Sequence, residues 1–167
     1  MGFTRREIIG TGTGVAGIAL LGGLGMAWPA TAAEGKFPLT LTDAQWRKKL
    51  GTGDTYAVLR HEATETPGSS KLLKEHRAGI FACAGCAQPA FSSKTKYDSG
   101  TGWPSFWAPL PNAVGTSSDS TIGYVRTEVH CSRCGGHLGH VFDDGPKPTG
   151  KRYCMNGVAL RFTPGAA

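Results

Sequence analysis

The sequence contains no run of five or more basic residues and no platform of interleaved aromatic and basic side chains. The formal net charge is +6, but only 18% of the residues are charged and the basic ones are scattered. Nucleic-acid binding would need a concentrated basic patch, commonly with aromatic side chains. The charge pattern therefore argues against a nucleic-acid partner and indicates an ordinary solvated surface.

Long helical periodicity and internal repeats are also missing. We expect one short helix at 43–50, because Thr42 and Gln45 form a capping box and Gly51 ends the segment. A short helix or turn is predicted near 71–77, irregular structure over 51–70 and mostly loop over 98–120. Segments 79–86, 121–131 and 152–162 are rich in β-branched and aromatic residues, which predicts strands. The fold should be mostly antiparallel β with a few short helices.

The first 33 residues have the composition of an export signal. Arg5 and Arg6 precede an uncharged stretch from Ile8 to Trp28, and small residues at 30–33 suit signal-peptidase cleavage. The paired arginines resemble a twin-arginine signal, with general secretion and a retained membrane anchor as alternatives. No cysteine follows the apolar stretch, so a lipoprotein anchor is excluded. We expect an exported protein, periplasmic or otherwise extracytoplasmic, that meets the membrane only in transit. A linker is expected over 34–38, a domain over 39–164 and a tail over 165–167.

Only five cysteines occur, and four of them form two CxxC pairs. Such turns aim two sulfurs at one point, and four thiolates match tetrahedral zinc, which would be structural because no coordination position stays open. The sheet must bring the two turns together. Two disulfides, or a redox-active CxxC, are the alternatives. The predicted zinc ligands are Cys83, Cys86, Cys131 and Cys134.

The fifth cysteine, Cys154, is left as a free thiol. Isolated cysteines are commonly small buried hydrophobes, but the neighbours of this one favour reactivity. Arg152 should lie on the same face of a strand, where a positive charge favours thiolate over thiol. His137 and His140 can exchange protons near neutral pH. Further candidates for the same site are Asn156, as a hydrogen-bonding group, and Trp103, as a flat apolar wall.

The segments GIFACAGC, FSSKTKYDSGTGWPSFW, VRTEVHCSRCGGHLGHVFDDGP and RYCMNGVALRF together resemble the B-type methionine-R-sulfoxide reductases, which contain a SelR-like domain. The resemblance covers roughly Leu39 to Phe162. It implies a β-tent-like fold of two antiparallel sheets with short helices, and structural zinc on the two CxxC pairs.

The resemblance also implies residue roles in reversing methionine oxidation. Cys154 would attack the sulfoxide sulfur and become a sulfenic acid, while His137 or His140 supplies a proton to the leaving oxygen. Trp103 would pack on the substrate methyl group, and Asn156 would orient the polar part of the site. Arg152 is assigned to the substrate site, and its electrostatic role is our inference. Oxidised proteins are the expected substrates.

Two positions depart from the family pattern. Many members carry a resolving cysteine where this chain has Thr101, and the sequence holds no sixth cysteine. We therefore expect direct reduction of Cys154 by an external thiol, either a small thiol or a thioredoxin-like partner. Met155 replaces a bulky aliphatic residue, with little expected effect. The enzyme is expected to be a monomer. A zinc-dependent interaction module without catalysis is the competing hypothesis.

Overall fold

The computed structural model describes residues 36–167. The predicted signal peptide and the start of the linker lie outside the described residues. Within the described range, no helix has both the length and the apolar character needed to cross a membrane.

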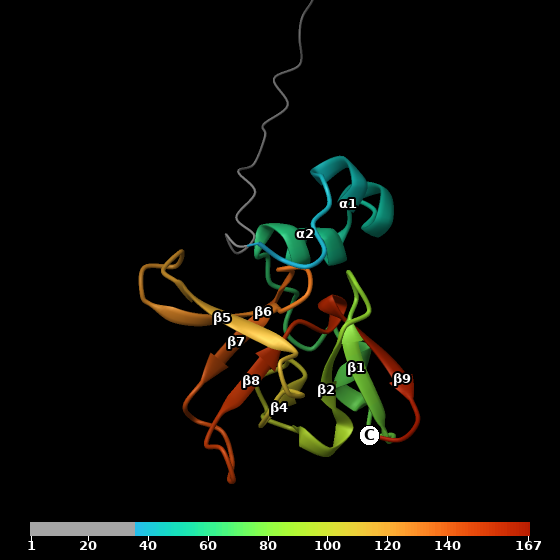
Figure 1. Ribbon diagram of the computed structural model, residues 1–167. Helices are drawn as coiled ribbons and strands as arrows, with labels where there is room; N and C mark the ends of the chain where they lie inside the picture. Colours follow the sequence, from blue (N-terminus) through green and yellow to red (C-terminus); the bar gives the residue numbers. More distant parts are fainter. Residues whose placement is uncertain (1–35) are drawn as a thin grey trace, which may run out of the picture.

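Two antiparallel sheets form the body of the molecule (Figure 1), which confirms the predicted fold class. The smaller sheet has the order β2-β1-β9, and the larger has the order β3-β4-β8-β7-β6-β5. All the strand pairs are antiparallel. The strands are β1 (Gly79–Cys83), β2 (Pro89–Ser92), β3 (Lys96–Tyr97), β4 (Ser105–Phe106), β5 (Val114–Asp119), β6 (Arg126–Cys131), β7 (His137–Phe142), β8 (Arg152–Met155) and β9 (Leu160–Pro164).

The first helix, α1 (Asp43–Leu50), forms where the sequence predicts it. Thr42 accepts a hydrogen bond from the backbone N–H of Gln45, and the Gln45 side chain accepts one from the backbone N–H of Thr42. This reciprocal pair is the capping box, and Gly51 terminates the helix with a positive φ of 74°. The turn at 71–77 is the 3₁₀ segment η1 (Lys71–Lys74), and η2 (Ser93–Thr95) and η3 (Gly157–Ala159) are further 3₁₀ segments.

The prediction of irregular structure over 51–70 is wrong in part, because α2 (Asp54–His61) forms there. Its N-cap, Gly53, offers no side-chain hydrogen bond, so the local start signal is weak. The helix is stabilised by tertiary packing instead, because Tyr56, Val58 and Leu59 are buried.

The prediction of mostly loop over 98–120 is also wrong in part. Strand β5 (Val114–Asp119) pairs with β6 along its whole length. Its sequence, VGTSSD, is polar, and the exposure of Thr116 and Ser118 fits an edge strand with one face in solvent. Within 152–162, η3 interrupts the predicted strand, so β8 ends at Met155 and β9 begins only at Leu160.

Aromatic side chains join the two sheets in the core. Phe106 of β4 stacks on Phe91 of β2, with ring centroids 4.5 Å apart, and meets Phe81 of β1 edge-on at 5.0 Å. All three rings are fully buried. Each ring removes a large apolar area from water, and these aromatic geometries add to that burial. The contact holds β4, and therefore its neighbour β8, against the smaller sheet.

Candidate active site and metal centre

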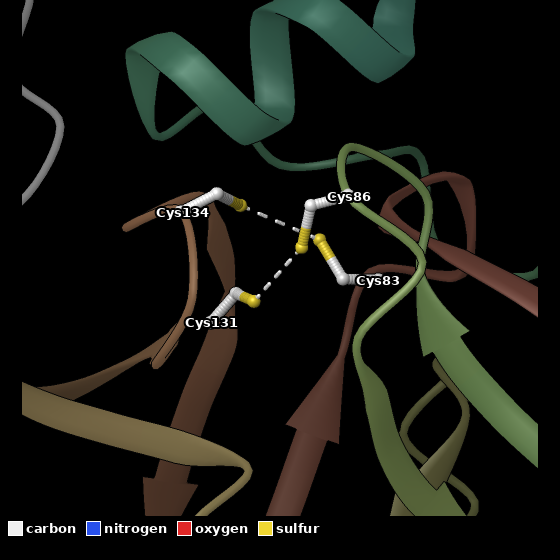
Figure 2. Close-up of side chains that lie close together, drawn as sticks. All are labelled: Cys83, Cys86, Cys131 and Cys134. Carbon is white, nitrogen blue, oxygen red and sulfur yellow. Dashed lines mark hydrogen bonds between the residues drawn. The ribbon is translucent and has the colours of Figure 1, made fainter. Parts of the chain in front are cut away.

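The four cysteines of the CxxC pairs form one buried cluster (Figure 2). Cys83 ends β1 and Cys131 ends β6, so each sheet contributes one of the two turns. The turns are thus brought together across the two sheets rather than within one of them. The four sulfur atoms lie within 4.8 Å of one another.

The sulfur spacing fits a tetrahedral metal ion. The Sγ atoms of Cys83 and Cys134 are 3.8 Å apart, and those of Cys86 and Cys131 are 3.5 Å apart. A disulfide would need about 2.05 Å. Four thiolates at about 2.3 Å from a central zinc ion would stand about 3.8 Å from one another. All five cysteines are free of disulfides.

Two arginines support the turns of this cluster. Arg60 of α2 donates to the backbone carbonyl of Cys134 at 3.2 Å, and Arg133 donates to the carbonyl of Cys86 at 3.3 Å. The guanidinium of Arg60 also stacks on the Trp46 ring, 4.9 Å from its centroid. A tetrathiolate site around a divalent ion carries net negative charge, and these cations lie where they offset it.

A separate cavity of about 100 Å³ contains the fifth cysteine. Four of the predicted site residues line it, namely Cys154, His140, Trp103 and Asn156. Strands β7 and β8 bring two of them together, because His140 and Cys154 are directly paired in the ladder. Cys154 is half-buried and stands outside the four-sulfur cluster. The remaining lining residues are Thr64, Arg126, Gly139 and Phe142.

Gly139 permits the close approach of β7 and β8 at this point. A Cβ atom on Gly139 would stand 2.1 Å from the carbonyl oxygen of Cys154 and 2.9 Å from the Cα of Met155. Both are backbone atoms that cannot move aside without shifting β8. The strand carrying the thiol therefore requires glycine between the two histidines.

His140 belongs to a charged network. Its Nε2 lies 2.7 Å from Asp119 Oδ2, and Arg126 donates to the same oxygen at 2.6 Å. Burial alone would raise the pKa of the Asp119 carboxyl. Hydrogen bonds from Thr121, His140 and Arg126 outweigh burial and hold that pKa well below its usual range. Burial lowers the pKa of His140, while Asp119 opposes this shift. His140 therefore donates Nε2–H to an ionised carboxylate.

The ring of His137 packs edge-on against that of His140, with the two ring centroids 5.2 Å apart. Its Nδ1 is 2.9 Å from Glu128 Oε1, and the side chain is 1% exposed. Hydrogen bonds from His130, His137 and Ser117 outweigh burial and keep the pKa of Glu128 well below normal. The Nε2 of His137 is buried without a hydrogen-bond partner in the described chain. Of the two histidines in the motif, only His140 lines the cavity within residues 36–167.

Glu65, from the loop after α2, connects Trp103 and Asn156, and the sequence analysis did not find it. Its carbonyl accepts the indole N–H of Trp103 at 3.1 Å, and its own N–H donates to Asn156 Oδ1 at 3.0 Å. Its carboxylate accepts from the backbone N–H groups of Gly157 and Val158. A single buried residue thus positions the aromatic wall, the amide and the turn that follows Cys154.

Arg152 does not line the cavity. Its assignment to the substrate site therefore stays a prediction. Its guanidinium makes two parallel hydrogen bonds of 2.8 Å to Asp144. The same group lies 4.3 Å from the centroid of the Phe142 ring, which lines the cavity. The Asp144 hydrogen bond is the main cause of the raised pKa of Arg152, with a smaller electrostatic contribution from Cys154. Arg152 therefore packs against Phe142, a residue of the cavity wall, without lining the cavity itself.

Thr101, at the position where many family members carry a resolving cysteine, lies against Cys154. Its Oγ1 is 3.6 Å from the Cys154 Sγ and 2.8 Å from Ser99 Oγ. Ser99 then contacts Ser105 at 2.7 Å, and Ser105 donates to the carbonyl of Trp103 at 3.1 Å. Each hydroxyl has one proton, so with Ser105 donating to the carbonyl, Thr101 donates to Ser99 and accepts from the thiol.

Three further charged residues of the site were also missed, namely Asp119, Arg126 and Glu128. A signal for two of them exists in the segment VRTEVHC, where Arg126, Glu128 and His130 alternate with uncharged residues. Alternate residues of a strand share one face, so this pattern places charge on one side of β6. Asp119 becomes recognisable only through its pairing with Arg126 in the ladder.

Comparison with known proteins matches residues 52–164 to the SelR domain family. "Peptide methionine sulfoxide reductase MsrB" of Leifsonia xyli is 50% identical over 135 residues, which is 80% of this chain and 96% of that protein. The protein of the same name from Agrobacterium fabrum is 50% identical over 124 residues, 74% of this chain and 91% of that protein. The one from Thiobacillus denitrificans is 52% identical over 124 residues, covering 74% and 93%. The chain belongs to the SelR domain family.

Proposed function

We propose that this protein reduces methionine-R-sulfoxide in oxidised proteins, and also as the free amino acid, to methionine. The observation that carries the proposal is the half-buried Cys154 thiol in a cavity lined by Trp103, His140 and Asn156. The four other cysteines are gathered elsewhere in the metal cluster. A binding module that used only the metal cluster would not need this second constellation.

In the proposed mechanism, the Cys154 thiolate attacks the sulfoxide and takes its oxygen. The sulfoxide is reduced to methionine, and Cys154 is oxidised to a sulfenic acid after one proton reaches the oxygen. His140 lines the cavity beside Cys154, so it is the histidine that gives this proton, while His137 and Asp119 hold its position. Trp103 covers the methyl group, and Asn156, held by Glu65, orients the polar end.

Turnover of the separate R and S epimers, measured with dithiothreitol, tests this function. We expect the metal-loaded protein to reduce the R epimer and Cys154→Ser to lose at least a thousandfold of that activity, because the nucleophile is gone. Equal metal content and an unchanged melting temperature in Cys154→Ser are the controls. A folded, metal-bound protein that reduces neither epimer would support the non-catalytic interaction module instead.

We propose that an external thiol reduces the sulfenic acid directly. Two thiols would be oxidised to a disulfide while the sulfenic oxygen leaves as water. Thr101→Cys places a thiol near the Cys154 sulfur, so this variant should form an internal disulfide and gain about tenfold in thioredoxin-supported turnover. Thr116→Cys, at an exposed position on β5, is the matched control. Peptide mapping that finds a Cys154 disulfide within the wild-type chain would refute direct reduction.

The pH profile should report the ionisation of His140. A histidine acting as an acid must be protonated, so activity falls as pH rises through its pKa, which burial has lowered. Asp119→Asn removes the charge that favours imidazolium, so the descending limb should move to lower pH, with about a tenfold loss of activity at pH 7. Asp143→Asn, at an exposed carboxylate, should leave the profile in place. Superimposable profiles for wild type and Asp119→Asn would exclude His140 as the acid.

We propose zinc as the metal of the four-cysteine cluster, since tetrahedral thiolate sites with this spacing suit zinc. We also propose that the protein is a monomer.

We propose export by the twin-arginine route on the basis of Arg5 and Arg6. N-terminal sequencing of the periplasmic protein should find a first residue near 33 or 34. A chain recovered only from the cytoplasm would contradict export.

A further inference from the structure

The tip of the β5–β6 hairpin, residues 120–125, carries an apolar surface that the mechanism does not use. Ile122, Tyr124 and Val125 are 52%, 61% and 72% exposed. Among residues 36–167 these are the only large hydrophobic side chains that are so exposed. Scattered exposed apolar residues are ordinary, but three within four positions form a patch that indicates a binding surface.

The tip is continuous with the cavity. The hairpin projects from the edge of the larger sheet (Figure 1), and its last ladder pair joins Asp119 to Arg126. Arg126 lines the cavity and follows directly after Val125. Asp119 is hydrogen-bonded to His140, which pairs with Cys154 in the β7–β8 ladder. A chain lying across the tip would therefore reach the cavity wall within one residue of Val125.

The chemistry of the tip selects its occupant. Residues 120–125, STIGYV, include no charged side chain, and Asp119 and Arg126 neutralise each other at the base. Three side chains of this size expose about 300 Å² in total, compared with about 800 Å² per partner in a standard interface between two proteins. The area is too small for a stable dimer and suits a few residues of one peptide.

We infer that the hairpin tip binds apolar side chains next to the oxidised methionine of a polypeptide substrate. The inference rests on the proposed reductase function and deepens it. Methionine normally lies among apolar neighbours, and oxidation to the polar sulfoxide disrupts such packing, which exposes those neighbours together with the sulfoxide. The tip holds the neighbours while Trp103 covers the methyl group. Free methionine sulfoxide occupies the cavity alone and does not touch the tip.

The test compares three substrates in one triple variant, Ile122→Ser/Tyr124→Ser/Val125→Ser. The substrates are free methionine-R-sulfoxide, a pentapeptide with leucines on both sides of the sulfoxide, and the same peptide with serines. We expect kcat/KM for the leucine peptide to fall about tenfold, mainly through KM. The free amino acid and the serine peptide should be unchanged. Thr116→Ala/Ser118→Ala, at exposed positions of β5, is the matched control.

Several outcomes would overturn the inference. Equal losses on all three substrates would show that the tip only supports Arg126, and no loss on the leucine peptide would show that it binds nothing in catalysis. Light scattering adds a further check, because a wild-type dimer that dissociates in the triple variant would assign the tip to a second copy. A wild-type protein that reduces none of the substrates would instead refute the reductase function itself.

Discussion

Cys131→Ser is expected to abolish the folded state. The serine removes one of the four ligands of the proposed zinc site, which would hold the ends of β1 and β6 together across the two sheets. Structural zinc contributes about 10–16 kcal/mol in small zinc peptides, whereas a whole domain has about 5–15 kcal/mol of net stability. Loss of the metal would therefore leave little or none of the stability of the domain. Circular dichroism, with zinc measured by mass spectrometry, checks the result.

Cys154→Ser is the matched control, because it also replaces a cysteine by serine but lies outside the four-sulfur cluster. It should keep one metal ion per chain and melt at the wild-type temperature. A strong chelator should unfold wild type and Cys154→Ser alike. If Cys131→Ser folds normally and stays stable without metal, the cluster does not support the fold.

Glu65→Ala is expected to give the second large effect, on activity and stability together. The alanine leaves the N–H groups of the buried Gly157 and the half-buried Val158 without their carboxylate acceptor. A buried unpaired group costs about 1–3 kcal/mol, so the free energy of unfolding should fall by about that amount, chiefly through Gly157. The turn that follows Cys154 would shift with Asn156, and a displacement of about 1 Å can lower kcat/KM about a hundredfold.

Glu65→Gln separates the charge of this side chain from its shape. Glutamine keeps one oxygen acceptor but turns an N–H₂ group towards the second backbone donor, so an intermediate loss is expected. Thr66→Ala, at the next and exposed position, should behave as wild type. Urea unfolding and steady-state kinetics measure both effects. A Glu65→Ala protein with wild-type kcat/KM would show that the turn after Cys154 keeps its position without the carboxylate.

The parts of the fold that could be predicted from sequence are those set by neighbouring residues. Helix α1 is one, because Thr42 and Gln45 cap it from within the same turn. Helix α2 and strand β5 are different, because their stability comes from packing against distant segments. Nothing in a polar stretch such as VGTSSD reveals that β6 will pair with it.

The residues of the candidate site also fall into two groups, those marked by local motifs and those placed by contacts far away in the sequence. Cys154, His140, Trp103 and Asn156 could be predicted because motifs mark their positions, and the structure gathers them around one cavity. Glu65 could not, since its contacts with Asn156 and Gly157 span 91 and 92 positions. Its neighbours in the sequence carry no period or motif that would indicate burial. For Arg152 the motif was not sufficient. It marks the residue as part of the site but does not show whether the side chain lines the cavity or packs outside its wall.

The long separation between Glu65 and Gly157 also bears on how the protein is made. A nascent chain that ends just after β1 contains α1, α2 and β1 but not the segment that Glu65 must hold. Contacts between residues so far apart in the sequence form late in folding, after the chain has closed large loops. Cys154, the proposed nucleophile, is synthesised after Trp103 and His140, which line the same cavity. A chain cut before Cys154 therefore lacks the thiol of the proposed site, and it also lacks the Gly157 N–H that donates to Glu65.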